Sequence, residues 1–190
     1  MNDWLKSGEQ TIITSNIKKI GNKISKKSSN EFEYIINVLK WIHKNIEKRE
    51  LSQKDKEDIF RKRTSTEIIK DGYSSGCTDI CLVFISLSRF YGIPTKYLEC
   101  VSKNVFRNND CVNGHVLASV YIKGSWYIVD PDMQTIDLNT KGSLYSKKYN
   151  IFQEDYDSWS FGVKSMMDLR EFLVSKLDCI EIVDGKLEKK

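Results

Sequence analysis

The sequence is poor in the residues that separate domains. Its only prolines are Pro94 and Pro131, and no segment has the Pro-, Gly- or Ser-rich composition of an interdomain linker. The length of 190 residues suits one compact domain, since most domains have about 100 to 200 residues. We therefore expect a single folded domain with short appendages.

Long apolar runs are also absent. The longest, residues 80–85, has six residues, whereas a membrane-spanning helix needs about 20. Residues 1–16 contain Asp3 and Glu9 and lack the apolar stretch of a secretory signal. We expect a cytoplasmic protein that has no membrane as its partner.

The chain has little excess charge of either sign. Residues 1–30 carry six lysines against Asp3 and Glu9, which accounts for the whole net charge of +4. Nucleic-acid recognition draws its affinity from clustered Lys and Arg, so the neutral remainder argues against a nucleic-acid partner. We expect residues 1–29 to form a basic N-terminal appendage, either a packed accessory helix or a mobile arm.

The cysteines do not suit a disulfide framework. There are five of them and they are scattered, so pairing would leave one thiol over. Free thiols in a reducing compartment fit this number better. The five are Cys77, Cys81, Cys100, Cys111 and Cys179.

Apolar residues at helical spacing predict four helices. Isoleucines at 13, 17, 20 and 24 form a stripe that Gly21 interrupts, and residues 30–46 form a stronger one that Asn30 can cap. Residues 76–91 are apolar on nearly every side, as in a buried central helix, and a last helix is expected over residues 165–177. The intervening residues 47–65 are densely charged and predict a solvated connection that can hold one short helix. Irregular chain is expected between Pro131 and the last helix.

After Pro94 the apolar period changes to two. Residues 97–101, 115–122 and 126–130 predict strands, and Lys123 and Gly124 predict a hairpin turn between the last two. The expected fold is therefore α+β, with a central buried helix packed on an antiparallel sheet. We place this domain at residues 30–180, followed by a charged tail at 181–190.

Cys77 stands at the predicted start of the central helix. A thiol there meets unpaired backbone N–H groups and the positive end of the helix dipole, which favour the thiolate. A buried core thiol is the alternative, because free cysteines are often buried. The placement makes Cys77 a candidate nucleophile with its own N–H as an oxyanion donor; Tyr73, just upstream, is more typical of packing.

A nucleophilic thiol needs a base and a group that orients it. The chain has two histidines. His43 lies among lysines on a predicted surface helix, whereas His115 opens a strand. If the hairpin turn holds two or four residues, opposed positions sum to 247, and Asp130 lies on the face of His115. Asp132 is a rival, but Pro131 is expected to end the strand before it.

These motifs resemble a known family. The run G-C-T-D-x-C-L-V-F, followed by G-H-V-L-A-S-V-Y-I and W-Y-I-V-D-P, is similar to the transglutaminase-like superfamily over roughly residues 31–177. The resemblance implies a papain-like fold with Cys77 as nucleophile, His115 as general base and acid, and Asp130 as the orienting carboxylate. It further implies amide acyl transfer on protein or peptide substrates, without a cofactor or a catalytic metal.

Other interpretations remain open at this level. Cys77, Cys81, Cys111 and His115 include a C-x3-C and a C-x3-H spacing, so a structural zinc site is an alternative. A non-enzymatic interaction domain that uses the lysine-rich head is another. A D-S-W element, with Asp157 and Trp159, is expected either to line the cleft or simply to pack.

Overall fold

The computed structural model describes residues 2–103, 114–139, 143–177, 180–183 and 186–189. Its main sheet is antiparallel, with strand order β6-β5-β4-β3-β7. These strands are β3 (Thr95–Ser102), β4 (Gly114–Ile122), β5 (Ser125–Asp130), β6 (Thr135–Asp137) and β7 (Tyr149–Asp155).

Helices and short elements complete the chain. The helices are α1 (Ser15–Ser25), α2 (Glu31–Asn45), α3 (Gln53–Ile59), α4 (Ser65–Asp71), α5 (Cys77–Phe90), α6 (Leu144–Lys148) and α7 (Met166–Lys176). The short 3-10 turns are η1 (Asn2–Leu5), η2 (Glu9–Thr11) and η4 (Trp159–Phe161). Two small ladders pair β1 (Glu47–Lys48) with β2 (Tyr73–Ser74), and β8 (Ile180–Val183) with β9 (Lys186–Lys189).

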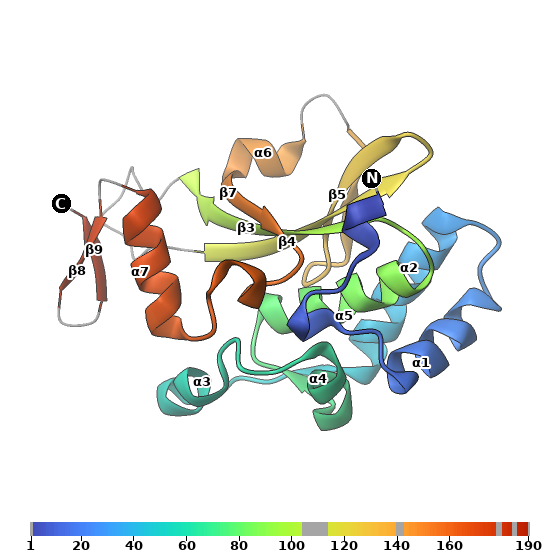
Figure 1. The fold of residues 1–190 in the computed structure, drawn as a ribbon, viewed down its shortest axis with the longest axis horizontal. Helices are drawn as coiled ribbons and strands as arrows, with labels where there is room; N and C mark the ends of the chain where they lie inside the picture. Colours follow the sequence, from blue (N-terminus) through green and yellow to red (C-terminus); the bar gives the residue numbers. More distant parts are fainter. Residues whose placement is uncertain (1, 104–113, 140–142, 178–179, 184–185, 190) are drawn as a thin grey trace.

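Helix α5 is the centre of the fold. Figure 1 shows it beneath the sheet, with α1, α2 and α4 around it and α6 on the opposite face of the sheet. The side chains from Thr78 to Arg89 are buried, which explains why this helix is apolar on nearly every side. The predicted α+β class and the buried central helix are confirmed.

The hairpin has the predicted register. Lys123 and Gly124 both have positive φ, as a two-residue turn between right-twisted strands requires. Tyr121 pairs with Trp126, and each further pair of the ladder sums to the same value of 247. The ladder therefore brings the face of β4 that carries His115 to the face of β5 that carries Asp130.

The basic N-terminal segment packs on the core. Ile17, Ile20 and Ile24 lie in the same hydrophobic cluster as the apolar residues of α5. Gly21 makes this contact close, because a Cβ built there would lie 2.1 Å from Cδ1 of Phe90. A glycine in mid-helix costs about 1 kcal/mol against alanine, and here it lets the two helices approach. The domain boundary at residue 29 stays a prediction.

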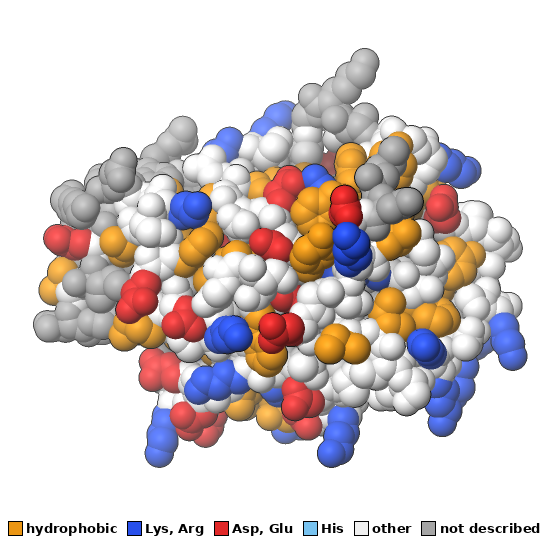
Figure 2. Space-filling view, in the orientation of Figure 1, with side chains coloured by type: hydrophobic (Ala, Val, Ile, Leu, Met, Phe, Trp, Pro, Cys, Tyr) orange, Lys and Arg blue, Asp and Glu red, His pale blue; other side chains and the backbone are white. Residues whose placement is uncertain are grey.

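Charged residues are distributed in a mixed pattern over the surface. Figure 2 shows acidic and basic side chains interspersed on the face in view, with hydrophobic side chains between them. No helix in the described part of the chain combines the length and the apolar character needed to cross a bilayer.

Three segments differ from the prediction. Residues 47–65 are not merely a solvated connection, since Arg61 and Arg63 are buried, with 2% and 7% exposure. Irregular chain was expected after Pro131, but β6, α6 and β7 form there, and β7 pairs with β3. The predicted tail contains the β8–β9 ladder. Sequence periodicity missed β6, α6, β7 and the β8–β9 ladder because these elements are short.

Candidate active site

Cys77 is the first residue of α5, and the chain before it is held by one carboxylate. Asp79 Oδ2 accepts hydrogen bonds from the backbone N–H of Ser75 at 2.8 Å and from its hydroxyl at 2.7 Å. Arg63, from the segment before α4, donates to the same oxygen. Cys77 is partly exposed at this helix start, while Cys81 and Cys100 are buried.

His115 and Asp130 are in direct contact. His115 Nε2 lies 2.8 Å from Asp130 Oδ2, and the two side chains are 13% and 2% exposed. The backbone N–H of Met133 donates to Asp130 Oδ1 at 3.1 Å, which holds the carboxylate from its other side. The rival, Asp132, instead forms an ion pair with Lys48 at 2.8 Å.

His115 also lies near Cys77, whose thiolate charge favours the protonated imidazole. Because Nε2 contacts Asp130, Nδ1 is the ring nitrogen left for the thiol. Burial lowers the pKa of His115, but the hydrogen bonds and the negative charges of Asp130 and Cys77 outweigh it and raise the pKa to about 10. The three residues that the sequence singled out are thus brought together around one imidazole.

The raised pKa of His115 predicts a pH-dependent stability. Protonated His115 stabilises the folded state fully below its ordinary pKa of 6.5, and this contribution is lost as the pH rises through about 10. In urea unfolding, the stability difference between wild type and His115→Gln should therefore shrink from near-neutral to alkaline pH. His43→Gln is the matched control, and a difference that grows with pH would contradict the prediction.

His43 contributes to the site only indirectly. It is exposed on α2, as predicted, and its Nε2 lies 2.7 Å from the carbonyl oxygen of Pro131. Together with the ion pair between Lys48 and Asp132, this contact holds the chain that follows Asp130. Sequence patterning did not predict either contact.

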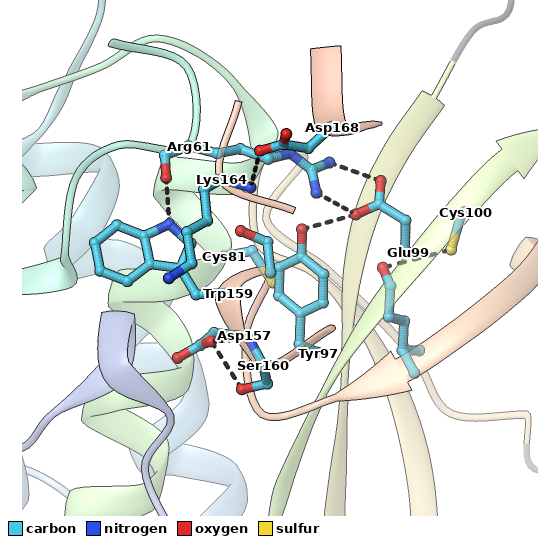
Figure 3. A network of polar contacts seen from close by, with 12 residues as sticks. Arg61, Cys81, Tyr97, Glu99, Cys100, Asp157, Trp159, Ser160, Lys164 and Asp168 are labelled. Atoms are coloured by element: carbon cyan, nitrogen blue, oxygen red, sulfur yellow. Dashed lines mark hydrogen bonds and ion pairs between the residues drawn. The ribbon is translucent and has the colours of Figure 1, made fainter. Parts of the chain in front are cut away.

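A buried ion pair lies on the α5 side of the sheet (Figure 3). Arg61 Nη2 donates to Glu99 Oε1 at 2.8 Å, Arg61 Nη1 lies 2.7 Å from Glu99 Oε2, and the Tyr97 hydroxyl donates to Oε2 at 2.9 Å. Burial lowers the pKa of Arg61, but the charge of Glu99 raises it above its ordinary value, with a smaller contribution from Cys77. Sequence patterning gives no sign of this pair, because its partners are 38 residues apart.

The D-S-W element is a structural junction. Asp157 is fully buried, and its Oδ2 accepts a hydrogen bond from the backbone N–H of Gln10 at 2.9 Å. Trp159 Nε1 donates to the carbonyl oxygen of Arg61 at 2.6 Å (Figure 3). These bonds join η2, η4 and the segment that contains Arg61. Of the two roles expected for Asp157 and Trp159, their contacts correspond to packing. Tyr73 likewise packs, beneath the guanidinium of Arg63.

The zinc alternative involves a residue outside the described part of the chain, Cys111. Within the described ranges, no three His, Cys, Asp or Glu side chains are grouped so that they could hold a metal ion. Cys81 Sγ, one of the four suggested ligands, instead donates to the carbonyl oxygen of Leu117 at 3.4 Å.

A solved structure of low sequence identity shares this fold. A cysteine protease of Cytophaga hutchinsonii superposes with a TM-score of 0.61 at 18% identity, over 85% of this chain and 49% of that one. A protease from Parabacteroides distasonis ATCC 8503 matches with a TM-score of 0.48 at 14% identity, over 67% of this chain and 24% of that one. Both are named only as putative, and this chain spans half or less of their length.

The family model gives the most direct assignment. No curated protein matches the sequence. The model of the transglutaminase-like superfamily matches residues 18–131, which is more than half of the chain and runs from within α1 to just past the end of β5. The chain therefore belongs to the transglutaminase-like superfamily.

Proposed function

We propose that this protein is a thiol-dependent acyl hydrolase or acyltransferase that acts on amide bonds of proteins or peptides. Cys77 is the nucleophile, His115 the general base and acid, and Asp130 the residue that orients the imidazole. The observation that carries the proposal is the position of His115, which lies 2.8 Å from Asp130 and close enough to Cys77 for the charge of the thiolate to raise the pKa of the imidazole. An imidazole between a thiol and a buried carboxylate is the arrangement that nucleophilic acyl transfer uses.

The reaction follows from this arrangement in two steps. The Cys77 thiolate attacks the amide carbonyl, and His115 gives its proton to the departing amine as the C–N bond breaks. The resulting thioester is attacked by water or by an acceptor amine, whose proton His115 takes up. The C–S bond then breaks, which releases the carboxylic acid or the new amide and restores the Cys77 thiolate beside the protonated imidazole.

The start of α5 suits the negative charge that develops on the carbonyl oxygen. Gly76, the N-cap residue, has no side chain to cap the first turn. The backbone N–H of Cys77 belongs to that turn, where unpaired N–H groups and the helix dipole stabilise an anion. We assign this N–H as an oxyanion donor.

Protein or peptide substrates are proposed from two lines of support. The superfamily match gives the general class of thiol-dependent amide chemistry. The Cytophaga hutchinsonii structure, which is named as a cysteine protease, shares the fold over 85% of this chain. For the zinc alternative, the described part of the chain contains no group of side chains that could hold a metal ion.

Alkylation of the individual thiols tests the proposal. Iodoacetamide is added at several pH values, and the alkylated cysteines are quantified by peptide mass spectrometry. Cys77 is expected to react fastest, because thiolate reactivity requires exposure and a nearby cation. Cys81 and Cys100 serve as internal controls, since both are buried and burial raises the pKa of each thiol.

The variant His115→Ala completes the test. Without the imidazole, alkylation of Cys77 near neutral pH should slow by about tenfold or more, because the thiolate loses its counter-ion. His43→Ala should slow alkylation by far less, since His43 contacts Pro131 and not Cys77. Equal rates for Cys77 in wild type and His115→Ala, or a rate for Cys77 no higher than for Cys81, would overturn the proposed function.

A further inference from the structure

A hydroxyl chain approaches Asp130 from the side opposite His115. Thr135, on β6, is the cross-strand partner of Asp130 on β5. The Thr135 hydroxyl hydrogen-bonds to the phenol oxygen of Tyr145, on α6. The Tyr145 phenol also lies near the Asp130 carboxylate, whose charge raises the pKa of the phenol.

The surroundings of the Tyr145 phenol act on its pKa in both directions. Burial raises the pKa of the phenol, the bond with Thr135 lowers it, and the nearby Asp130 carboxylate raises it. A carboxylate that raises the pKa of a phenol favours its protonated form, which is the form that can donate to that carboxylate.

A second tyrosine from the same segment covers the imidazole. The ring of Tyr149, which begins β7, stacks on His115 with centroids 5.3 Å apart and planes at 29°. Tyr145 and Tyr149 are themselves stacked, with centroids 6.5 Å apart and planes at 14°. The two rings thus contact both members of the His115–Asp130 pair.

The segment that carries the tyrosines is anchored next to the site. Asp137, at the end of β6, accepts hydrogen bonds from the Ser143 hydroxyl at 2.9 Å and from the backbone N–H of Leu144 at 2.6 Å. Asp137 also accepts a hydrogen bond from the backbone N–H of Asn139. This bond, together with the other two, outweighs the effect of burial and lowers the pKa of Asp137. The start of α6 is therefore fixed to the strand that lies beside Asp130, so the Tyr145 ring has a defined position.

We propose that Tyr145 is a positioning residue that extends the Cys77–His115–Asp130 set into a hydrogen-bonded chain ending at Thr135. Its phenol donates a hydrogen bond to the Asp130 carboxylate and stabilises part of its negative charge. The carboxylate then attracts the proton of His115 less strongly. The inference rests on the proposed function, in which His115 must release that proton to the leaving amine. Tyr149 shields the same pair from water.

The consequence for proton transfer has a definite sign. Without the phenol, Asp130 still has the Met133 N–H on Oδ1, so the carboxylate stays in place. Its unshared charge then attracts the imidazolium more strongly, which raises the pKa of His115. A more weakly acidic imidazolium is a poorer proton donor to the leaving amine.

Several titratable groups surround His115 and must be considered together. The pKa of His115 responds to Cys77 from α5 and to Asp130 from β5. Cys100 on β3 is its cross-strand partner, and Tyr149 from β7 stacks on its ring. Burial raises the pKa of Cys100 far above its ordinary value, so that thiol stays neutral over the range in which His115 titrates.

The test is an NMR titration of the two histidines in the full chain. Protein labelled at histidine is titrated as wild type, Tyr145→Phe and Thr135→Val, and His43 serves as an internal reference because the chain has only two histidines. In Tyr145→Phe the pKa of His115 is expected to rise by about half a unit to one unit. In Thr135→Val a smaller rise is expected, since the phenol becomes a weaker donor.

Tyr121→Phe is the matched control, because Tyr121 lies near the other end of β4. It should leave both titrations unchanged. An unchanged or lower pKa of His115 in Tyr145→Phe, with the His43 signal as in wild type, would overturn the inference. A role of Tyr145 in packing alone would alter unfolding but not this titration.

Alkylation separates this inference from the proposed function. If Cys77 reacts as expected in wild type but Tyr145→Phe does not shift the His115 titration, only the role of Tyr145 is wrong. If Cys77 is not reactive, the proposed function falls, and the titration still reports whether Tyr145 acts on Asp130 and His115.

Discussion

Replacing Cys77 with alanine is expected to abolish acyl transfer. Hydrolysis of p-nitrophenyl acetate should fall by about 10³-fold or more, because the variant has no atom at this position that can form the acyl intermediate. The wild type should also carry a single acetyl group on the peptide that contains Cys77 when the reaction is stopped early. Release of p-nitrophenol and peptide mass spectrometry measure the two effects.

Cys81→Ala is the matched control for this experiment. Cys81 lies one helical turn further along α5 and is buried, with its thiol bonded to the Leu117 carbonyl oxygen. Its removal should change the hydrolysis rate by less than about twofold, since the side chain does not contact the reacting atoms. Comparable losses in Cys77→Ala and Cys81→Ala would show that stability, and not a nucleophile, underlies the effect.

The second large effect is expected on stability, at the buried ion pair. Arg61→Met should lower the free energy of unfolding by about 3–5 kcal/mol, because it leaves a buried carboxylate without its partner. That carboxylate belongs to Glu99, which is 1% exposed. Urea unfolding near neutral pH measures the loss.

Two comparisons identify the cause of that loss. The double variant Arg61→Met with Glu99→Gln should recover most of the stability, since neither charge is then buried alone. Lys96→Met, which breaks the more exposed pair of Lys96 with Glu154, should cost no more than about 1 kcal/mol. If the double variant were as unstable as Arg61→Met, lost packing and not an unpaired charge would explain the effect.

Local signals were sufficient for the elements that carry the proposed catalytic residues. Gly76 before the central helix and Gly92 after it predicted its bounds within one residue, and the helix observed is Cys77–Phe90. The turn at Lys123 and Gly124 predicted the hairpin register. These signals are readable because caps and turns depend on residues within a few positions of one another.

The surroundings of the site were not predictable in the same way. The charged segment 47–65 has the composition of a solvated connection. Its Arg61 and Arg63 are nevertheless buried, where they pair with Glu99 and Asp79. Whether a charge is buried depends on a partner from a distant strand or helix, and no periodicity within the segment records that partner.

The same limit applies to the tyrosines of α6 and β7. Residues 132–164 show no regular apolar period, because β7 is only half-buried and α6 has five residues. Their place beside His115 results from the pairing of β7 with β3 and from the hydrogen bonds of Asp137. Tyr145 and Tyr149 are therefore residues that only the folded chain brings to the site.

Three features could be predicted from the sequence: the central helix that begins at Cys77, the hairpin that puts His115 and Asp130 on one face, and the resemblance to the family. Three others are visible only in the folded chain: the 2.8 Å contact between His115 and Asp130, the burial of the Arg61–Glu99 pair, and the position of Tyr145 near Asp130. The physical reason is range: propensity, capping and turn preferences act over a few residues. Hydrogen-bond distances and the pKa of His115 depend on groups that meet only when the sheet closes over α5.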